Sequence, residues 1–237
     1  MKKFIQKKLR SFLSFVELYF RIKNENKSPV DVYYDNLSQD CYNFFEKDMK
    51  NSSIFIKVED IRKFSIHKAF NNGDQNNVFL EFGVWKGESI NLFGSFLSKH
   101  KAEIYGFDSF EGLTEDWLTH VYNPIGALSL NSKTPKVLKN VKLVKGKIQE
   151  TLESFLKNKS DKKIIFAHMD MDTYASTKYA LNKIKPFLQK GSVILFDEFY
   201  GYPNWQLQEY KAFTEIFDEK EYKYIAFCAS EVAIEIL

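Results

Sequence analysis

The stretch "YKYIAFCASEVAIEIL", residues 222–237, decides how the fold closes. It holds two apolar runs, 222–229 and 231–237, whose β-branched and aromatic residues are typical of strands. Only Ser230 lies between them. Because a crossover between parallel strands needs a dozen or more residues, these two strands must pair as an antiparallel hairpin.

Upstream of this hairpin, short apolar runs alternate with segments of helical spacing. The apolar runs are residues 77–83, 102–108, 141–146, 162–170 and 191–197, and the helical segments are 88–100, 148–156, 173–188 and 204–220. Such alternation implies parallel strands with helices on both faces. The sequence therefore predicts an α/β fold: a Rossmann-like, doubly wound, seven-stranded sheet, mostly parallel, with an antiparallel C-terminal hairpin. Residues 111–138 are polar and are expected to be irregular.

The composition is that of an ordinary globular protein, with 44% hydrophobic and 27% charged residues among 237. A net charge of +3 is too small to indicate a nucleic-acid partner, and none is expected. Cys41 and Cys228 lack metal-ligand spacing, so we interpret them as reduced thiols of a cytoplasmic protein. The sequence has no run of 18 or more apolar residues, so no transmembrane helix is predicted.

Residues 1–70 are expected to form a helical extension, followed by the main domain over residues 71–237. The extension would comprise an amphipathic helix over 2–22, a polar linker over 23–35, and further helices before the core. Lys7 and other basic residues interrupt what would be the core of a signal peptide.

Two interpretations of the basic amphipathic helix stay open. It packs on the domain or on a second subunit of a homo-oligomer, or it lies on the anionic inner face of the membrane through residues 2–20.

The stretch "LEFGVWKGES", residues 80–89, joins a predicted strand to a predicted helix. It carries Glu81, Gly83 and Gly87 in the pattern E-x-G-x-x-x-G. Glycines let the backbone turn sharply and lie against a ligand, and the start of the helix offers free N–H groups. Ser89 could add a hydroxyl. The alternative is a tight strand–helix turn without a ligand.

Asp108 ends the next strand, 27 residues after Glu81. An acidic side chain at this point could accept both hydroxyls of a ribose, or it could serve as a turn or cap aspartate. Gly146 ends the third strand, where an adenine ring would lie. Because ligands of open sheets bind outside the carboxyl ends of strands, Asp170 and Asp197 are expected at the same edge.

The stretch "FAHMDMDTYAST", residues 166–177, ends a buried strand with two carboxylates. Alternate residues share one side of a strand, so Asp170 and Asp172 would lie about 7 Å apart and repel each other. A positively charged group is therefore expected close to them. His168 alternates with them and is expected to pack or form a hydrogen bond. Asp172 could instead cap the following helix.

Five stretches in this order resemble the macrocin O-methyltransferase family of class I S-adenosylmethionine-dependent methyltransferases. They are "EFGVWKGES", "GFDSFEGLTEDW", "GKIQETL", "HMDMDTYAST" and "ILFDEFYGY". The resemblance spans about residues 78–215 and extends more distantly to metal-dependent catechol-type O-methyltransferases. A sheet closed by an antiparallel hairpin is also the layout of class I methyltransferases.

The resemblance implies S-adenosyl-L-methionine as cofactor. The candidate cofactor-binding residues are Glu81, Gly83, Trp85, Gly87, Ser89, Asp108, Ser109, Gly146, Ile148 and Asp170. It also implies Mg²⁺ or Mn²⁺ held by Asp170, Asp197 and Glu198, and oxygen ligands suit such hard cations. Glu198 departs from the aspartate or asparagine that is common at its position.

Catechol-type relatives carry a lysine base just after the first metal aspartate, and "MDMDTY" has none. The candidate catalytic residues are therefore Asp172 as the nearest base, Asp170 beside it, and His120 on the irregular segment. The aromatic residues Trp117, Tyr200, Tyr202 and Trp205 are expected to wall an acceptor pocket.

These residues together predict a metal-assisted O-methyltransferase that acts on a hydroxyl of a sugar or glycan-type small molecule. Two alternatives stay open: a cofactor-binding scaffold protein without turnover, and a nicotinamide oxidoreductase. The terminal hairpin and the lack of a G-x-G-x-x-G motif weigh against the oxidoreductase.

Overall fold

The computed structural model describes Leu13, residues 27–73 and residues 76–237. Apart from Leu13, the expected helix over 2–22 lies outside the described residues. The chain divides into two compact units, Met1–Phe44 and Phe45–Leu237. This division does not coincide with the expected boundary at residue 70.

Helix α2 (Pro29–Lys50) begins inside the segment that was expected to be a linker over 23–35. Ser28 and Asp31 explain this start. The Ser28 N–H donates to Asp31 Oδ2 at 2.9 Å, and the Asp31 N–H donates to Ser28 Oγ at 3.2 Å. This reciprocal capping satisfies N–H groups at the helix start, and Pro29 needs no such partner.

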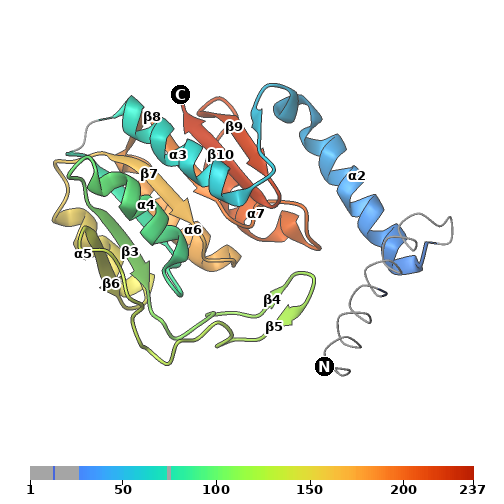
Figure 1. Ribbon diagram of the computed structural model, residues 1–237, viewed down its shortest axis with the longest axis horizontal. Coiled ribbons are helices and arrows are strands. Elements are labelled where there is room, and N and C mark those ends of the chain that lie inside the picture. The colour runs from blue at the N-terminus through green and yellow to red at the C-terminus, as the bar shows by residue number, and fades with distance from the viewer. Residues whose placement is uncertain (1–12, 14–26, 74–75) are drawn as a thin grey trace, which may run out of the picture. The chain divides into compact units, whose positions relative to one another are not determined.

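The second unit is built on an eight-stranded sheet in the order β1-β9-β10-β8-β7-β2-β3-β6 (Figure 1). The strands are β1 (Ser53–Ile54), β2 (Val78–Phe82), β3 (Ile104–Asp108), β6 (Val141–Lys145), β7 (Ile164–Met169), β8 (Leu188–Phe196), β9 (Tyr222–Cys228) and β10 (Glu231–Ile236). β10 runs antiparallel to both of its neighbours, and the other pairs are parallel. The predicted α/β fold and its C-terminal hairpin are confirmed.

The prediction of seven strands was wrong by one. The additional strand is β1, where Ser53 pairs with Ala226 at the outer side of β9. Two residues are too few to show an alternating pattern. In addition, β4 (Trp117–Leu118) and β5 (Tyr122–Asn123) form a separate two-stranded sheet within the segment that was expected to be irregular.

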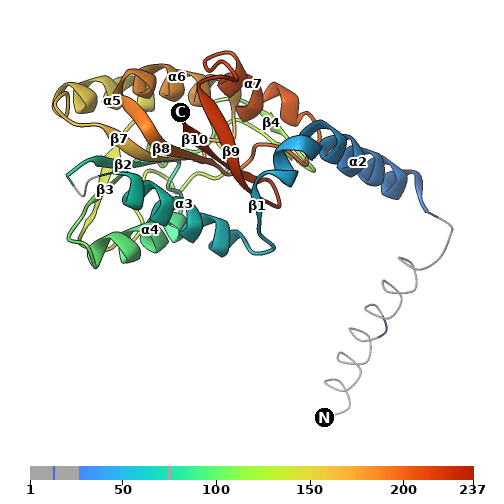
Figure 2. The same cartoon turned by 90° about the horizontal axis from the view of Figure 1, so that it is seen from above.

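Helices cover both faces of the large sheet, as Figure 2 shows. On one face lie α3 (Val58–Asn72) and α4 (Glu88–Ser98), and on the other lie α5 (Ile148–Lys157), α6 (Tyr174–Ile184) and α7 (Glu209–Thr214). The 3-10 turn η1 (Lys185–Phe187) follows α6, and η2 (Trp205–Leu207) precedes α7. α7 is shorter than the predicted helix over 204–220. It begins after Gln208, whose backbone is non-helical with φ −110° and ψ −125°, and it ends at Thr214.

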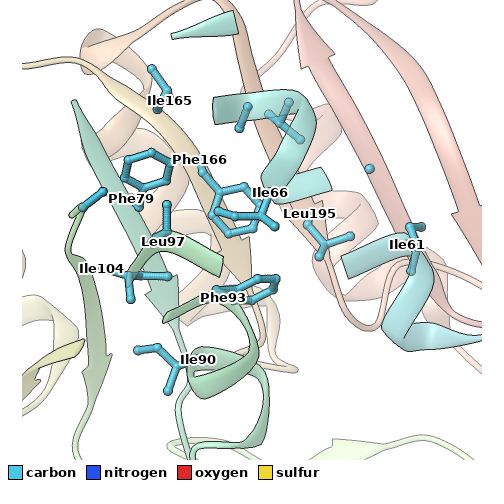
Figure 3. Close-up of a cluster of buried hydrophobic side chains, with 14 of the residues drawn as sticks. Ile61, Ile66, Phe79, Ile90, Phe93, Leu97, Ile104, Ile165, Phe166 and Leu195 are labelled. Carbon is cyan, nitrogen blue, oxygen red and sulfur yellow. The ribbon is translucent and has the colours of Figure 1, made fainter. Parts of the chain in front are cut away.

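One cluster of the apolar core lies between the sheet and the helices α3 and α4 (Figure 3). All five residues of β2 and all six of β7 are buried. Ile61 and Ile66 of α3 belong to this core, although the sequence placed them in the extension. Burial of one isoleucine or phenylalanine side chain contributes about 1.5–3 kcal/mol to the free energy of unfolding.

Neither cysteine in the chain forms a disulfide, and both are buried. Among the described helices, none is both long and apolar enough to span a bilayer.

Candidate active site

A cavity of about 370 Å³ lies along the carboxyl ends of the parallel strands. It is lined by Arg62, Gly83, Val84, Trp85, Lys86, Glu88, Ser89, Phe107, Asp108, Ser109, Gly112, Leu113, Thr114, Trp117, Leu128, Gly146, Lys147, Ile148, Gln149, Asp170, Met171, Asp172, Thr173, Ser176 and Asp197. Eight of the ten candidate cofactor residues are among them, since only Glu81 and Gly87 are not.

The turn between β2 and α4 needs glycine at two positions. Gly83 has φ +87°, and a Cβ there would lie 1.6 Å from the carbonyl oxygen of Asp170. Gly87 has φ +82° and caps α4. Since a side chain at Gly83 would strike the backbone after β7, glycine lets these two segments touch.

Asp108 organises this turn through its carboxylate. Its Oδ2 accepts hydrogen bonds from the N–H groups of Val84 at 2.9 Å and Trp85 at 2.7 Å. Its Oδ1 accepts one from the N–H of Phe110 at 2.6 Å. Asp108 therefore fixes two loops and lines the cavity at the same time.

Glu81 lies behind the cavity wall and does not line it. It is fully buried, with Oε1 accepting from Ser89 Oγ at 3.1 Å and Oε2 lying 3.1 Å from His168 Nδ1. Burial raises the pKa of Glu81, and the hydrogen bond and charge of His168 act against this rise. Its direct contact with a cofactor stays a prediction.

His168, Asp170 and Asp197 form a cluster at the ends of β7 and β8. One ligand atom of each lies within 4.8 Å of the others. His168 Nε2 is buried and has no hydrogen-bond partner among the described residues. Burial, followed by the charges of Asp197, Asp172 and Glu81, raises the pKa of Asp170 well above its usual value. These oxygen and nitrogen donors suit a divalent cation.

Arg62 of α3 forms an ion pair with Asp197. Its guanidinium donates to Asp197 Oδ1, and its Nε donates to Glu231 Oε1 at 2.7 Å. Burial alone would raise the pKa of Asp197, but its interaction with Glu231 and the charges of His168 and Arg62 lower it. Arg62 was not predicted as a site residue, because nothing in the sequence of its helix distinguishes it from the other basic residues.

Asp172 lines the cavity in a left-handed backbone conformation, with φ +64°. β7 ends at Met169, so the expected strand spacing between Asp170 and Asp172 does not apply. Burial, followed by the charges of Asp197 and Asp108, raises the pKa of Asp172 to about 7.

Other residues occupy the capping positions of α6, so the alternative role of Asp172 as a helix cap is not supported. The cap residue is Thr173, whose side chain makes no capping bond. The N–H groups of Tyr174 and Ala175 donate to Gln208 Oε1 at 3.1 Å and Glu115 Oε1 at 3.0 Å.

The structure does not bring Glu198 or His120 to the cluster. The Glu198 N–H donates to Glu209 Oε2 at 3.3 Å, and burial, then Asp197 and Asp172, raise the pKa of Glu198 to about 8. His120 is exposed in the turn between β4 and β5 and does not line the cavity.

Of the four aromatic residues expected at an acceptor pocket, only Trp117 lines the cavity. Tyr200 and Trp205 pack on Phe45, with ring centroids 5.4 and 5.5 Å away. The Tyr202 hydroxyl donates to the Glu198 carbonyl at 3.0 Å. The expectation for Tyr200, Tyr202 and Trp205 was wrong because apolar packing and backbone hydrogen bonding hold them elsewhere.

A mostly parallel sheet closed by an antiparallel hairpin, with a cavity at the carboxyl ends of its strands, is the architecture of class I methyltransferases. The family described as "Methyltransferase domain" matches residues 80–199, which is half of the chain. The chain belongs to this family.

Solved structures share the fold at low sequence identity. The calicheamicin methyltransferase CalS11 is 20% identical with a TM-score of 0.59, covering 91% of this chain and 96% of that one. The apo structure of CalS11, described as a TDP-rhamnose 3'-O-methyltransferase, is 21% identical with a TM-score of 0.55, covering 89% of this chain and 96% of that one. The O-methyltransferase NovP is 18% identical with a TM-score of 0.57, covering 75% of this chain and 78% of that one. The comparison with curated proteins gave no match.

Proposed function

We propose that this protein transfers the methyl group of S-adenosylmethionine to a hydroxyl of a sugar or glycan-type small molecule, as a macrocin O-methyltransferase-like enzyme. One observation carries the proposal: a single cavity joins the turns at Gly83, Asp108 and Gly146 to the carboxylates of Asp170, Asp172 and Asp197. The first group suits a nucleoside, and the second suits a hydroxyl that must lose a proton.

The donor side of the cavity would hold the cofactor through backbone and carboxylate groups. Gly83 lets the turn after β2 pack directly on the backbone of Asp170, and both residues line the cavity. The Asp108 carboxylate, already fixed by three N–H groups, retains lone pairs for ribose hydroxyls. The methyl group is already electrophilic, so this side mainly has to orient it.

The acceptor side would position and deprotonate the hydroxyl. Asp172 takes the proton, because its raised pKa of about 7 makes it an effective base near neutral pH. Trp117 and Leu128 would exclude water from this side. Asp170 and Asp197 would hold Mg²⁺ or Mn²⁺, which lowers the pKa of a bound hydroxyl when present.

The name of one structural relative supports a sugar acceptor, since CalS11 is described as a TDP-rhamnose 3'-O-methyltransferase. NovP is described as an O-methyltransferase, with no acceptor named. At this identity, the CalS11 name suggests testing nucleotide sugars first.

The test begins with thermal shift of the full-length protein. S-adenosylhomocysteine should raise the melting temperature, and NAD⁺ should not. Transfer of a labelled methyl group from S-adenosylmethionine is then screened against nucleotide sugars and lipid-linked glycans, with and without EDTA. Stabilisation by NAD⁺ alone would support an oxidoreductase. Binding of S-adenosylhomocysteine without transfer to any acceptor would favour the scaffold alternative. Transfer unchanged by EDTA would remove the metal from the proposal.

A further inference from the structure

His168 is held between two different environments. It lies on β7 directly beside Glu81 of β2 in the parallel register, and its side chain is fully buried. On one side, Nδ1 lies 3.1 Å from Glu81 Oε2. Glu81 is itself fixed, because Ser89 Oγ donates to its other oxygen at 3.1 Å. The orientation of the imidazole ring is therefore set from behind the cavity wall.

The second ring nitrogen, Nε2, faces the carboxylates. It is buried without a hydrogen-bond partner among the described residues, and Asp197 Oδ1 lies 3.9 Å away. That separation is too long for a hydrogen bond. In the neutral imidazole, a carboxylate on Nδ1 favours the tautomer with its proton there, which leaves a lone pair on Nε2. This lone pair then faces the Asp197 carboxylate, whose Oδ1 also accepts from Arg62.

The size of this gap suits a metal ion. Two donor atoms that each lie about 2.1 Å from one ion are at most about 4.2 Å apart. The distance of 3.9 Å between His168 Nε2 and Asp197 Oδ1 falls within this limit. The ligand atom of Asp170 lies within 4.8 Å of both, so binding of an ion would draw its carboxylate closer.

We propose that His168 Nε2 is a direct ligand of the metal, together with Asp170 and Asp197, and that Glu81 is the outer residue that orients His168. This inference rests on the proposed function only in placing the metal beside the acceptor side of the cavity. It replaces Glu198, which lies outside the cluster, as the third protein ligand. An imidazole ligand favours transition-metal ions such as Mn²⁺, Co²⁺ or Zn²⁺ over Mg²⁺.

The direct test is pulsed electron paramagnetic resonance of the full-length protein loaded with Mn²⁺. A coordinated imidazole couples its nitrogen nucleus to the Mn²⁺ electron spin, whereas an all-oxygen site shows no such coupling. We expect nitrogen coupling in the wild type, and preferential binding of Mn²⁺ over Mg²⁺ in calorimetric competition. Bound Mn²⁺ with oxygen ligands alone would overturn the proposal, as would the absence of Mn²⁺ binding.

Three variants sharpen the assignment. His168→Gln should abolish the nitrogen coupling and weaken Mn²⁺ binding at least about 10-fold. Glu81→Gln should retain the coupling but weaken binding about 10–100-fold, as loss of an outer partner does elsewhere. His100→Gln, in the turn after α4 where the ring packs on Phe70, is the matched control and should change neither. Loss of coupling in His100→Gln but not in His168→Gln would contradict the proposal.

The outcome is separable from that of the proposed function. S-adenosylhomocysteine binding, measured by calorimetry in EDTA, tests the cofactor without any metal. If it binds while Mn²⁺ shows oxygen ligands only, the role of His168 is overturned and the methyltransferase proposal stands. If His168→Gln does not fold, the wild-type spectrum still decides the question.

Discussion

The two sides of the cavity differ in how far the protein satisfies its own polar groups. On the donor side, the Asp108 carboxylate accepts three backbone hydrogen bonds, and Gly83 lies tightly against Asp170. On the acceptor side, which is the acidic one, Asp170 and Asp172 have raised pKa values, and Nε2 of His168 lacks a partner among the described residues. The donor side is therefore complete as a piece of the fold, whereas the acidic side is suited to gain from a bound ligand.

The largest effect on activity is expected from Asp172→Asn. If Asp172 is the base, methyl transfer should fall about 10²–10⁴-fold, while Mn²⁺ affinity and the melting temperature stay near the wild type. Single-turnover kinetics and calorimetry measure the two properties. A variant with wild-type turnover would mean that the proton leaves by another route.

The ion pair of Arg62 should dominate stability on the acidic side. Arg62→Met leaves Asp197 and Glu231 partly buried without their cation, so we expect a loss of about 3–5 kcal/mol in the free energy of unfolding. Lys63→Met is the neighbouring control, because the Lys63–Glu59 pair is exposed and contributes little to stability. Equal losses in urea titrations of both variants would contradict a special role for Arg62.

On the donor side, adding a single methyl group at Gly83 should lower the free energy of unfolding. Gly83→Ala places Cβ 1.6 Å from the Asp170 carbonyl oxygen, so a destabilisation of at least about 3 kcal/mol is expected. Gly126→Ala has a similar φ of +82° but no atom within 4 Å of the added Cβ. It should lose only about 1–2 kcal/mol, from backbone strain alone. Similar losses would mean that strain, and not the contact with Asp170, makes glycine necessary.

Asp108→Ala should weaken S-adenosylhomocysteine binding by about 1.5–3 kcal/mol, the usual worth of hydrogen bonds to a charged group. Calorimetry gives the affinity, and a thermal melt shows whether the turn at Val84 and Trp85 has also loosened. An affinity equal to that of the wild type would remove Asp108 from the cofactor site.

The smallest expected effect concerns pH and Glu209. Burial, followed by the charges of Asp172 and Asp197, raises the pKa of Glu209 well above 4.5. Between the pKa of Glu209 in the unfolded chain and its raised pKa in the folded protein, the unfolded chain has released a proton that the folded chain still holds. Stability therefore falls as pH rises, until the folded pKa is passed.

Glu209→Gln should flatten this decline between pH 5 and pH 8 in thermal melts. Each kcal/mol corresponds to about 2–4 °C for a protein of this size. Glu103→Gln, on the exposed surface, should keep the wild-type slope. An unchanged slope in Glu209→Gln would show that other carboxyls set the pH dependence.

The fold was predictable because its evidence is local in the sequence. Apolar runs, glycines and the short connection at Ser230 determine strands, turns and the final hairpin. The same holds for Asp108, Asp170 and Asp197, since carboxyl ends of parallel strands meet at one edge. The two-residue strand β1 was beyond reach, because pairing with β9 and not its own pattern makes it a strand.

Residues that depend on long-range contacts were harder to assign. Arg62 reaches Asp197 from 135 positions away, which no spacing rule anticipates. His168 alternates with Asp170, so its position was visible, but its unpartnered Nε2 was not. Glu198 was assigned by adjacency to Asp197, whereas its side chain forms a hydrogen bond with Ser230.

The loop that carries β4 and β5, drawn in green in Figure 1, is closed at its base. Leu113 exchanges two backbone hydrogen bonds there, donating to the Ala127 carbonyl and accepting from the Gly126 N–H, each at 2.9 Å. Just inside this base, Glu115 Oε1 accepts from the N–H of Ala175 at 3.0 Å. Doubling the length of a flexible loop costs only about 0.6 kcal/mol once its ends are joined. Insertions within residues 118–125 should therefore cost the fold little, whereas Trp117 beside them belongs to the cavity wall and would have to be kept.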